Sequence, residues 1–152
     1  MKNVVMMVIS SFIIQYFIMP PIMVNRMTDI TFTLGNAYLS LFMGLLMGVV
    51  EVIMYDMRYN VTSVKYYVSL LLGAGVCVYL YRYQIGITDK QYLEEMIEHH
   101  SMALLTSDRI VKKTDNYDVA AFSKTILQQQ TDEIIKMRDI LSKLNHENHE
   151  NK

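Results

Sequence analysis

The sequence predicts an all-α protein in two parts, a membrane domain of apolar helices followed by a water-exposed helical hairpin. The first half contains uncharged apolar runs long enough to cross a bilayer, and the second half repeats apolar residues at helical spacing. Charge is divided in the same way, because residues 1–81 carry four basic and three acidic side chains and residues 82–152 carry the other ten and twelve. We therefore predict a membrane domain at 1–83, a hairpin at 84–145 and a polar tail at 146–152.

The first apolar helix is expected at about residues 4–24. This stretch has no charged residue and about the 20 residues that a crossing requires, with Pro20 and Pro21 near its end. A cleaved signal peptide is the alternative, because a lysine precedes the apolar run. No small-residue cleavage site follows it, however, and further apolar segments do, so we expect the segment to span the membrane.

The second and third apolar helices are expected at about residues 34–55 and 64–81, joined by short loops. Tyrosines gather near the ends of the third helix, which is typical of side chains at the headgroup level. In the second helix, Gly44 and Gly48 form a G-x-x-x-G motif, which permits another helix to approach closely but also arises often by chance. The motif indicates a helix contact and leaves self-association open.

Several side chains within the apolar helices have more than one interpretation. Met43, Met47 and Met54 lie within about 40° of one another on a helix, either as adaptable packing residues or as a path for a soft metal. Glu51 is either a functional acid inside the membrane or a residue near the headgroups. Cys77 is the single cysteine, so it forms no intrachain disulfide and is expected to be a packed thiol.

The hairpin is predicted from its capping residues and its apolar periodicity. Thr88 and Gln91 form a capping box, so a helix is expected to begin near Asp89. After a polar break, Asn116 or Asp118 caps a second helix with its own apolar stripe. The short connection makes the two helices antiparallel.

The hairpin is expected to need a partner. Neither apolar stripe closes a core by itself, because two helices bury little surface. Docking of two hairpins into a four-helix bundle is therefore predicted, and with it a homodimer or a higher homo-oligomer. The tail at 146–152 lacks apolar positions that would hold it against such a bundle, so we expect it to be disordered.

Potential metal ligands gather on the facing sides of the hairpin. On the first helix, Met96 lies about 60° from His99 and about 40° from His100. The candidate ligands from both helices are Met96, His99, His100, Gln130, Glu133 and Met137. Thioether with imidazole favours Cu(I), whereas imidazole with carboxylate also suits Zn(II) or Cu(II). Ordinary core packing of these histidines and methionines is the alternative.

Two segments of the hairpin resemble the motifs of domain-of-unknown-function family 305. Residues 96–109 begin with Met-Ile-Glu-His-His, which is similar to the family's opening M-I-P-H-H motif, and residues 130–137 match its second motif, Q-x-x-E-I-x-x-M. Glu98 replaces the usual proline, so it either adds a carboxylate or points outward, and the first helix is expected to be straighter. Residues 116–118 replace the usual D-P at the start of the second helix.

The resemblance covers about residues 88–144, and the segment around Met43 also resembles the membrane-anchored branch of the family. It implies a ferritin-like helical bundle and, for some members, copper binding by methionine and histidine on the extracytoplasmic side. The N-terminus would then be cytoplasmic. The basic residues of the loops hardly favour either orientation by themselves.

The leading hypothesis is a membrane-anchored protein that binds or buffers Cu(I) at the extracytoplasmic face. Its ligands would be Met96, His99, His100 and Met137, with Glu133 and Gln130 orienting or completing the site. His146 and His149 in the tail are either a weak auxiliary clamp or solvated. The alternative hypothesis is a structural or interaction module whose hairpin mediates oligomerisation or partner binding without metal.

Two further classes of function are not expected from the sequence. The chain has no basic block, and its net charge is −1, so a nucleic-acid partner is excluded. Neither Glu95 nor Glu133 has a histidine three residues later, as di-iron bundle enzymes require, and no serine has an evident histidine and carboxylate relay. We therefore expect a protein that is not an enzyme.

Overall fold

The computed structural model describes the backbone of residues 2–150 and the side chains of residues 3–146. The described residues form helices and connecting turns, without a strand, which confirms the predicted all-α fold. The chain forms two compact units. The apolar unit comprises Met1–Pro20 and Leu34–Ile87, and the hairpin unit comprises Pro21–Thr33 and Thr88–Lys152.

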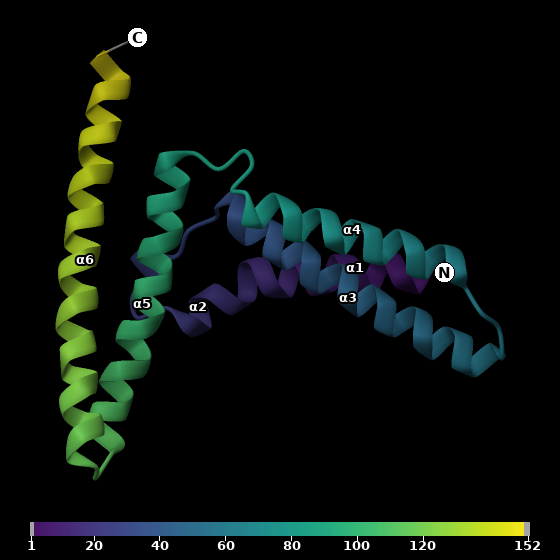
Figure 1. Ribbon diagram of the computed structural model, residues 1–152, viewed down its shortest axis with the longest axis horizontal. Coiled ribbons are helices and arrows are strands. Elements are labelled where there is room, and N and C mark those ends of the chain that lie inside the picture. The colour runs from purple at the N-terminus through teal and green to yellow at the C-terminus, as the bar shows by residue number, and fades with distance from the viewer. Residues whose placement is uncertain (1, 151–152) are drawn as a thin grey trace. The chain divides into compact units, whose positions relative to one another are not determined.

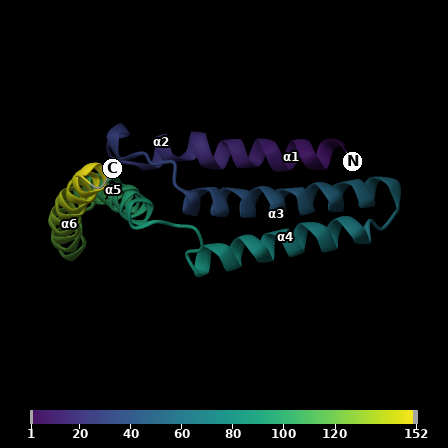
Figure 2. The ribbon, with the colours of Figure 1, turned by 90° about the horizontal axis from the view of Figure 1, so that it is seen from above.

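Among the described residues, three helical stretches are long and apolar enough to cross a membrane, as judged by length and composition: Asn3–Met23, Leu34–Tyr59 and Val64–Arg82. The first consists of α1 (Lys2–Ile13), the π-helical segment η1 (Ile14–Ile18) and α2 (Met19–Met23). The second and third are α3 (Leu34–Tyr59) and α4 (Val64–Arg82), and Figure 2 shows α3 lying between α1 and α4. All three predicted apolar helices are therefore present.

Small residues of α3 allow α1 to approach closely. Ser40, Gly44, Gly48 and Val52 are buried at four-residue spacing along α3. A Cβ atom on Gly44 would lie 2.8 Å from the backbone oxygen of Val8, a distance that real side chains do not tolerate. The G-x-x-x-G motif thus makes a helix contact within the chain, as its small residues predict.

The sulfur-containing residues of the apolar unit differ in their surroundings. Met43, Met47 and Met54 have exposed side chains on the outer side of α3, so they do not pack in the interior of this unit. Cys77 of α4 is buried, as expected for a packed thiol. The methionine stripe therefore lies on the outer surface of the apolar unit.

The two acidic residues in the second half of α3 have different environments. Asp56 is buried, and its carboxylate accepts hydrogen bonds from the Ser63 amide at 2.8 Å and the Ser63 hydroxyl at 2.7 Å. This pair closes the turn between α3 and α4. Glu51 is half-buried roughly two turns before Tyr59, where it lines a cavity together with Arg58. It therefore lies nearer the middle of α3, which falls between residues 46 and 47, than its end.

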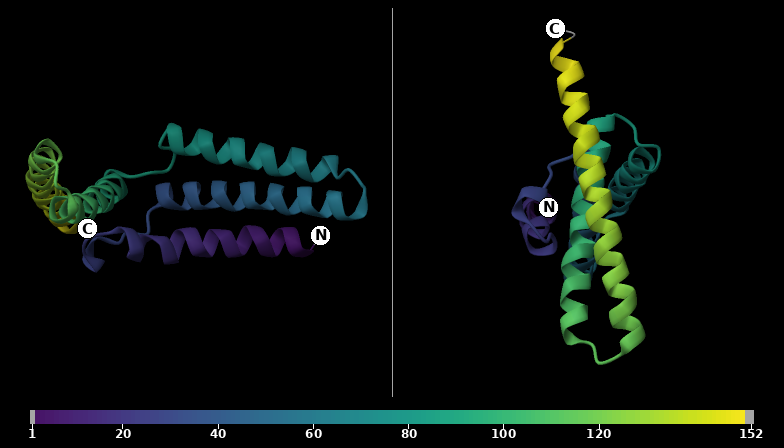
Figure 3. Two further views of the ribbon diagram at one scale, coloured as in Figure 1. Left: turned by 90° about the horizontal axis from the view of Figure 1, so that it is seen from below. Right: turned by 90° about the vertical axis from the view of Figure 1, so that its left-hand side faces the viewer.

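The hairpin unit is built on the antiparallel helices α5 (Asp89–Lys113) and α6 (Tyr117–Glu150), shown in Figure 1 and in the right panel of Figure 3. Residues 146–150 continue α6 where the polar composition predicted a disordered tail. Adding residues to an existing helix requires no new nucleus, which accounts for this difference. The rest of the predicted tail, residues 151–152, lies outside the described residues.

Both hairpin helices begin at caps of the predicted kind. Thr88 accepts a hydrogen bond from the Gln91 amide at 3.3 Å, and the Gln91 side chain accepts one from the Thr88 amide at 3.4 Å, which confirms the capping box. Asn116 accepts a hydrogen bond from the Val119 amide at 3.0 Å. Of the two predicted caps of α6, Asn116 is therefore the one whose side chain fills the role.

The hairpin unit also includes residues 21–33, which are the end of α2 and the connection from it to α3. This segment contains the short 3-10 helix η2 (Met27–Asp29) and packs with α5 and α6. The sequence placed it in the membrane domain. Its position follows from buried polar contacts that join it to α5 and α6, described below.

Candidate functional site

His100 lies on the seam between α5 and α6, and its imidazole faces Glu133. The Nδ1 atom of His100 is 3.3 Å from the Glu133 carboxylate, and the histidine side chain is 18% exposed. Although this is within ion-pairing distance, Nδ1 is shielded from solvent and forms no hydrogen bond with the described part of the chain. A buried polar atom without a partner costs about 1–3 kcal/mol of stability. Binding a partner at this nitrogen would remove that cost.

Polar groups of α6 meet at the same point of the seam. The side-chain amide of Gln130 donates a hydrogen bond at 3.4 Å to the Glu133 oxygen that faces His100. Glu133 is half exposed, with 50% of its side chain accessible. An amide, a carboxylate and an imidazole of the predicted ligand set therefore come together.

Two methionines lie one helical turn further along the seam. Met96 precedes His100 by one turn of α5, and Met137 follows Glu133 by one turn of α6. Because the helices are antiparallel, both displacements run in the same direction, which places the two thioethers at one level of the hairpin. Both side chains are half-buried. The seam thus combines one imidazole with two thioethers and a carboxylate.

His99 differs from the other predicted ligands. It is exposed, because consecutive helical residues point about 100° apart and its neighbour His100 occupies the seam. Within the described residues, no group of three or more His, Cys, Asp or Glu side chains could hold a metal ion. A metal at the seam would therefore depend on the methionines. His146 is exposed on α6, and the side chain of His149 lies outside the described residues.

A second polar cluster, which the sequence did not reveal, joins the connection between α2 and α3 to the hairpin. Asp29 is 2% exposed; it accepts a hydrogen bond from the Ser101 hydroxyl at 2.6 Å and forms an ion pair with Arg138. Ser101 in turn accepts a hydrogen bond from the Asn25 amide at 3.0 Å. These three elements, η2, α5 and α6, are thereby held together.

Glu98 belongs to this second cluster and not to the seam. It is 3% exposed, and its carboxylate accepts hydrogen bonds from the Thr31 amide at 2.7 Å and the Thr31 hydroxyl at 2.8 Å. Both predicted roles of Glu98, an added metal ligand or an outward-pointing side chain, are therefore wrong. The reason is angular, because Glu98 lies about 60° from Ser101 on a helix and so shares the face that meets residues 21–33.

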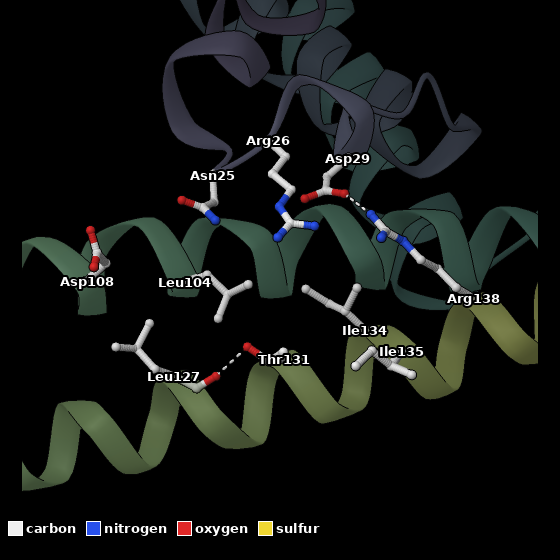
Figure 4. Close-up of a pocket in the computed structure, with 10 residues that line it drawn as sticks. All are labelled: Asn25, Arg26, Asp29, Leu104, Asp108, Leu127, Thr131, Ile134, Ile135 and Arg138. Atoms are coloured by element: carbon white, nitrogen blue, oxygen red, sulfur yellow. Dashed lines mark hydrogen bonds and ion pairs between the residues drawn. The ribbon is translucent and has the colours of Figure 1, made fainter.

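A pocket of about 470 Å³ opens beside the Asp29–Arg138 pair. Figure 4 shows Asn25 and Arg26 approaching it from the connection between α2 and α3, with side chains of α5 and α6 on the other sides. Its apolar lining includes Leu104, Leu127 and Ile134. None of the candidate metal ligands of the seam lines this pocket.

The hairpin is also the part of the chain that matches a known family. Residues 81–152 match the model of the family described as domain of unknown function (DUF305). Over 138 residues the chain is 33% identical to an uncharacterised protein of Acanthamoeba polyphaga mimivirus, in an alignment that covers 91% of this chain and 90% of that protein. No solved structure matches the chain.

Proposed function

The chain belongs to the DUF305 family, and from this premise we propose that it is a membrane-anchored protein that binds Cu(I) at the hairpin seam. The observation that carries the proposal is the Nδ1 atom of His100, which is buried without a hydrogen bond in the described residues. Met96 and Met137 lie on the same seam. Two thioethers with one imidazole form a soft donor set, which suits Cu(I) better than Zn(II).

Each seam residue has a definite part in this proposal. His100, Met96 and Met137 would hold the metal, because Cu(I) prefers soft donors such as thioether sulfur. Glu133 faces the imidazole at 3.3 Å, and Gln130 holds the Glu133 carboxylate by its hydrogen bond. Because Glu133 faces the same Nδ1 atom that would bind the metal, its carboxylate is assigned to complete the site, and Gln130 is assigned as the residue that positions this carboxylate.

The apolar helices define where the protein would act. The three stretches that are long and apolar enough to span a bilayer would hold the hairpin at a membrane. We place the N-terminus in the cytoplasm, so an odd number of crossings puts the hairpin on the extracytoplasmic side. There the protein would buffer Cu(I) without catalysing a reaction.

A homodimer or a higher homo-oligomer is part of the same proposal. Several large apolar side chains of α6 remain exposed, among them Phe122 at 68%, Ile140 at 45% and Val119 at 41%. Exposed apolar side chains on one helix favour a partner that covers them. A second hairpin docked there would complete the four-helix bundle that the sequence predicts.

The direct test is an anaerobic Cu(I) titration of the full chain in lipid nanodiscs against a chromophoric Cu(I) chelator. His100→Gln and the pair Met96→Leu with Met137→Leu should each weaken binding by at least about tenfold, equivalent to 1.4 kcal/mol. Leucine nearly conserves the volume of methionine, so packing is retained. Exposed His99→Gln is the matched control and should leave the affinity unchanged. Equal affinity in the seam variants and wild type would overturn the proposal.

An interaction module that works without metal is the second candidate. It is favoured by the exposed apolar side chains of α6 and by the lack of a His/Cys/Asp/Glu metal group among the described residues. His100→Gln separates the two functions, because Phe122→Asp should dissociate the oligomer in either case. In a metal-independent module His100→Gln should change neither the oligomer nor the metal content, as measured by light scattering and metal analysis.

A further inference from the structure

The pocket beside the Asp29–Arg138 pair has the size of a ligand site. Its volume of about 470 Å³ lies within the range of roughly 300–1,000 Å³ that small-molecule sites occupy. All of its lining residues belong to the hairpin unit, from residues 21–33, α5 and α6. The seam residues Met96, His100 and Met137 do not line it, so the pocket is separate from the proposed copper site.

The charges around the pocket leave one cation without a counter-charge. Arg138 is paired with the buried carboxylate of Asp29, and Asp108 is paired with Lys112 at 2.7 Å. Arg26 also lines the pocket, and it forms no ion pair with the described side chains. Figure 4 shows its guanidinium extending from residues 21–33 toward α5. The uncompensated charge is positive, so the pocket favours an anionic group.

The remaining lining of the pocket is apolar. Leu104 comes from α5, and Leu127, Ile134 and Ile135 come from α6; Ile135 is 60% exposed. The Thr131 hydroxyl donates its hydrogen bond to the Leu127 carbonyl at 2.7 Å, so it has no donor left for a ligand. A bare inorganic anion would leave this apolar surface uncovered. A ligand that carries both an anionic group and an apolar portion fits the lining better.

Chain connectivity limits where the pocket lies. Arg26 follows closely after Met23, the last residue of the first membrane-length stretch, and a fully extended chain spans at most about 11 Å between them. The interfacial layer of a bilayer adds about 5–7 Å on each side of the hydrocarbon core. If the stretch spans the bilayer, the Arg26 side chain is therefore within reach of lipid phosphates.

From these observations we propose that the pocket is a binding site for an anionic amphiphile, whose phosphate or carboxylate contacts Arg26 while its apolar portion covers the leucine and isoleucine side chains. The ligand chemistry is that of a phosphate ester with an apolar tail. An anionic phospholipid supplies it from the membrane, and a soluble phosphate compound supplies the same anionic group from water. The site does not depend on metal binding at the seam.

The test uses the full chain purified in detergent and native mass spectrometry with added phosphatidylglycerol or phosphatidylcholine. The wild type should retain at least about fivefold more phosphatidylglycerol than Arg26→Gln does, equivalent to about 1 kcal/mol. Arg26→Lys keeps the charge and should retain most of the binding. Arg109→Gln removes an exposed arginine that lines a different groove of the hairpin, so it serves as the matched control.

Competition with inorganic phosphate distinguishes the sources of the anion. If millimolar phosphate leaves the Arg26-dependent lipid adducts intact, the membrane lipid is the ligand. If phosphate displaces the lipid and binds in an Arg26-dependent way, the anion site stands and a soluble phosphate compound is its ligand. Equal lipid retention by wild type, Arg26→Gln and Arg109→Gln overturns the proposal, as does retention without preference for the anionic lipid. Neither result bears on Cu(I) affinity, which is measured separately.

Discussion

Replacing Arg138 by methionine should loosen residues 21–33 more than replacing Asp29 by asparagine, although both changes remove the same ion pair. The two partners differ in burial, because the Asp29 side chain is 2% exposed and that of Arg138 is 43% exposed. Arg138→Met leaves a carboxylate buried with the Ser101 hydroxyl as its remaining hydrogen-bond donor. Asp29→Asn leaves a guanidinium that water can reach, and the amide oxygen still accepts from Ser101.

The magnitudes follow from this asymmetry. Removing one partner of a fully buried ion pair costs about 3–5 kcal/mol, and the partial exposure of Arg138 lowers this to about 2–4 kcal/mol for Arg138→Met. Asp29→Asn loses a charge-assisted hydrogen bond, which corresponds to about 1–2 kcal/mol. The double variant should lose about 1–2 kcal/mol less stability than the two single variants lose together, because no buried charge is left.

Amide hydrogen exchange of the full chain in nanodiscs measures these losses where they occur. The Asn25 amide is bonded to Ser101 and the Thr31 amide to Glu98, so both should be protected in the wild type. Each 1.4 kcal/mol lost accelerates exchange about tenfold. If Asp29→Asn accelerates exchange as much as Arg138→Met, burial of the carboxylate does not set the cost and the explanation fails.

Two further predictions concern helix contacts and the residue that departs from the family motif. Gly44→Ala should lower the stability of the full chain in detergent by about 1–3 kcal/mol, because its Cβ would meet the Val8 oxygen at 2.8 Å. The loss is measured as a lower thermal unfolding midpoint. Gly75→Ala, with nothing within 4 Å, should be neutral or slightly stabilising, and equal effects would contradict the packing argument. Glu98→Ala should accelerate exchange at Thr31 by about tenfold or more, since it removes the acceptor that the Thr31 amide bonds at 2.7 Å. Glu98→Gln retains an acceptor and should change exchange at Thr31 little. Faster exchange in Glu98→Gln than in Glu98→Ala would show that Glu98 does not protect Thr31 as a hydrogen-bond acceptor.

Much of the fold was predictable because it depends on local patterns. Helices α3 and α4 are set by long uncharged runs, and α5 begins at a cap that two residues, Thr88 and Gln91, specify between them. The helix contact at Gly44 was predictable as well, since small residues in an apolar helix let another helix approach closely. Each of these features depends on residues that are close together in the sequence.

The second polar cluster was not predictable in this way. Asp29 is separated from Ser101 by 72 residues and from Arg138 by 109, and no periodicity links such positions. The available signal was the carboxylate itself, because an acidic residue in a short connection between two apolar helices needs either water or a partner. Glu98 gave no such signal, because its neighbours on the same helix face include Glu94, Glu95 and Ser101, and yet it is buried with Thr31.

The seam was partly predictable from helix geometry. Angles on one helix place Met96 between His99 and His100, so they identify the methionine but do not choose between the histidines. The choice depends on where the neighbouring elements lie. Because residues 21–33 and α6 occupy adjacent sides of α5, His100 is left on the seam and His99 on the exposed side.

On both α5 and α6, a residue of the seam is directly followed by a residue of the polar cluster around Asp29. Measurements on seam variants must therefore be interpreted together with the state of that cluster. On α5, His100 faces Glu133 while Ser101 bonds Asp29; on α6, Arg138, which also bonds Asp29, directly follows the half-buried Met137. A substitution that rotates or shifts either helix therefore disturbs both clusters. Loss of Cu(I) affinity with unchanged exchange at Asn25 and Thr31 can be assigned to a lost ligand, whereas loss accompanied by faster exchange reports a displaced helix.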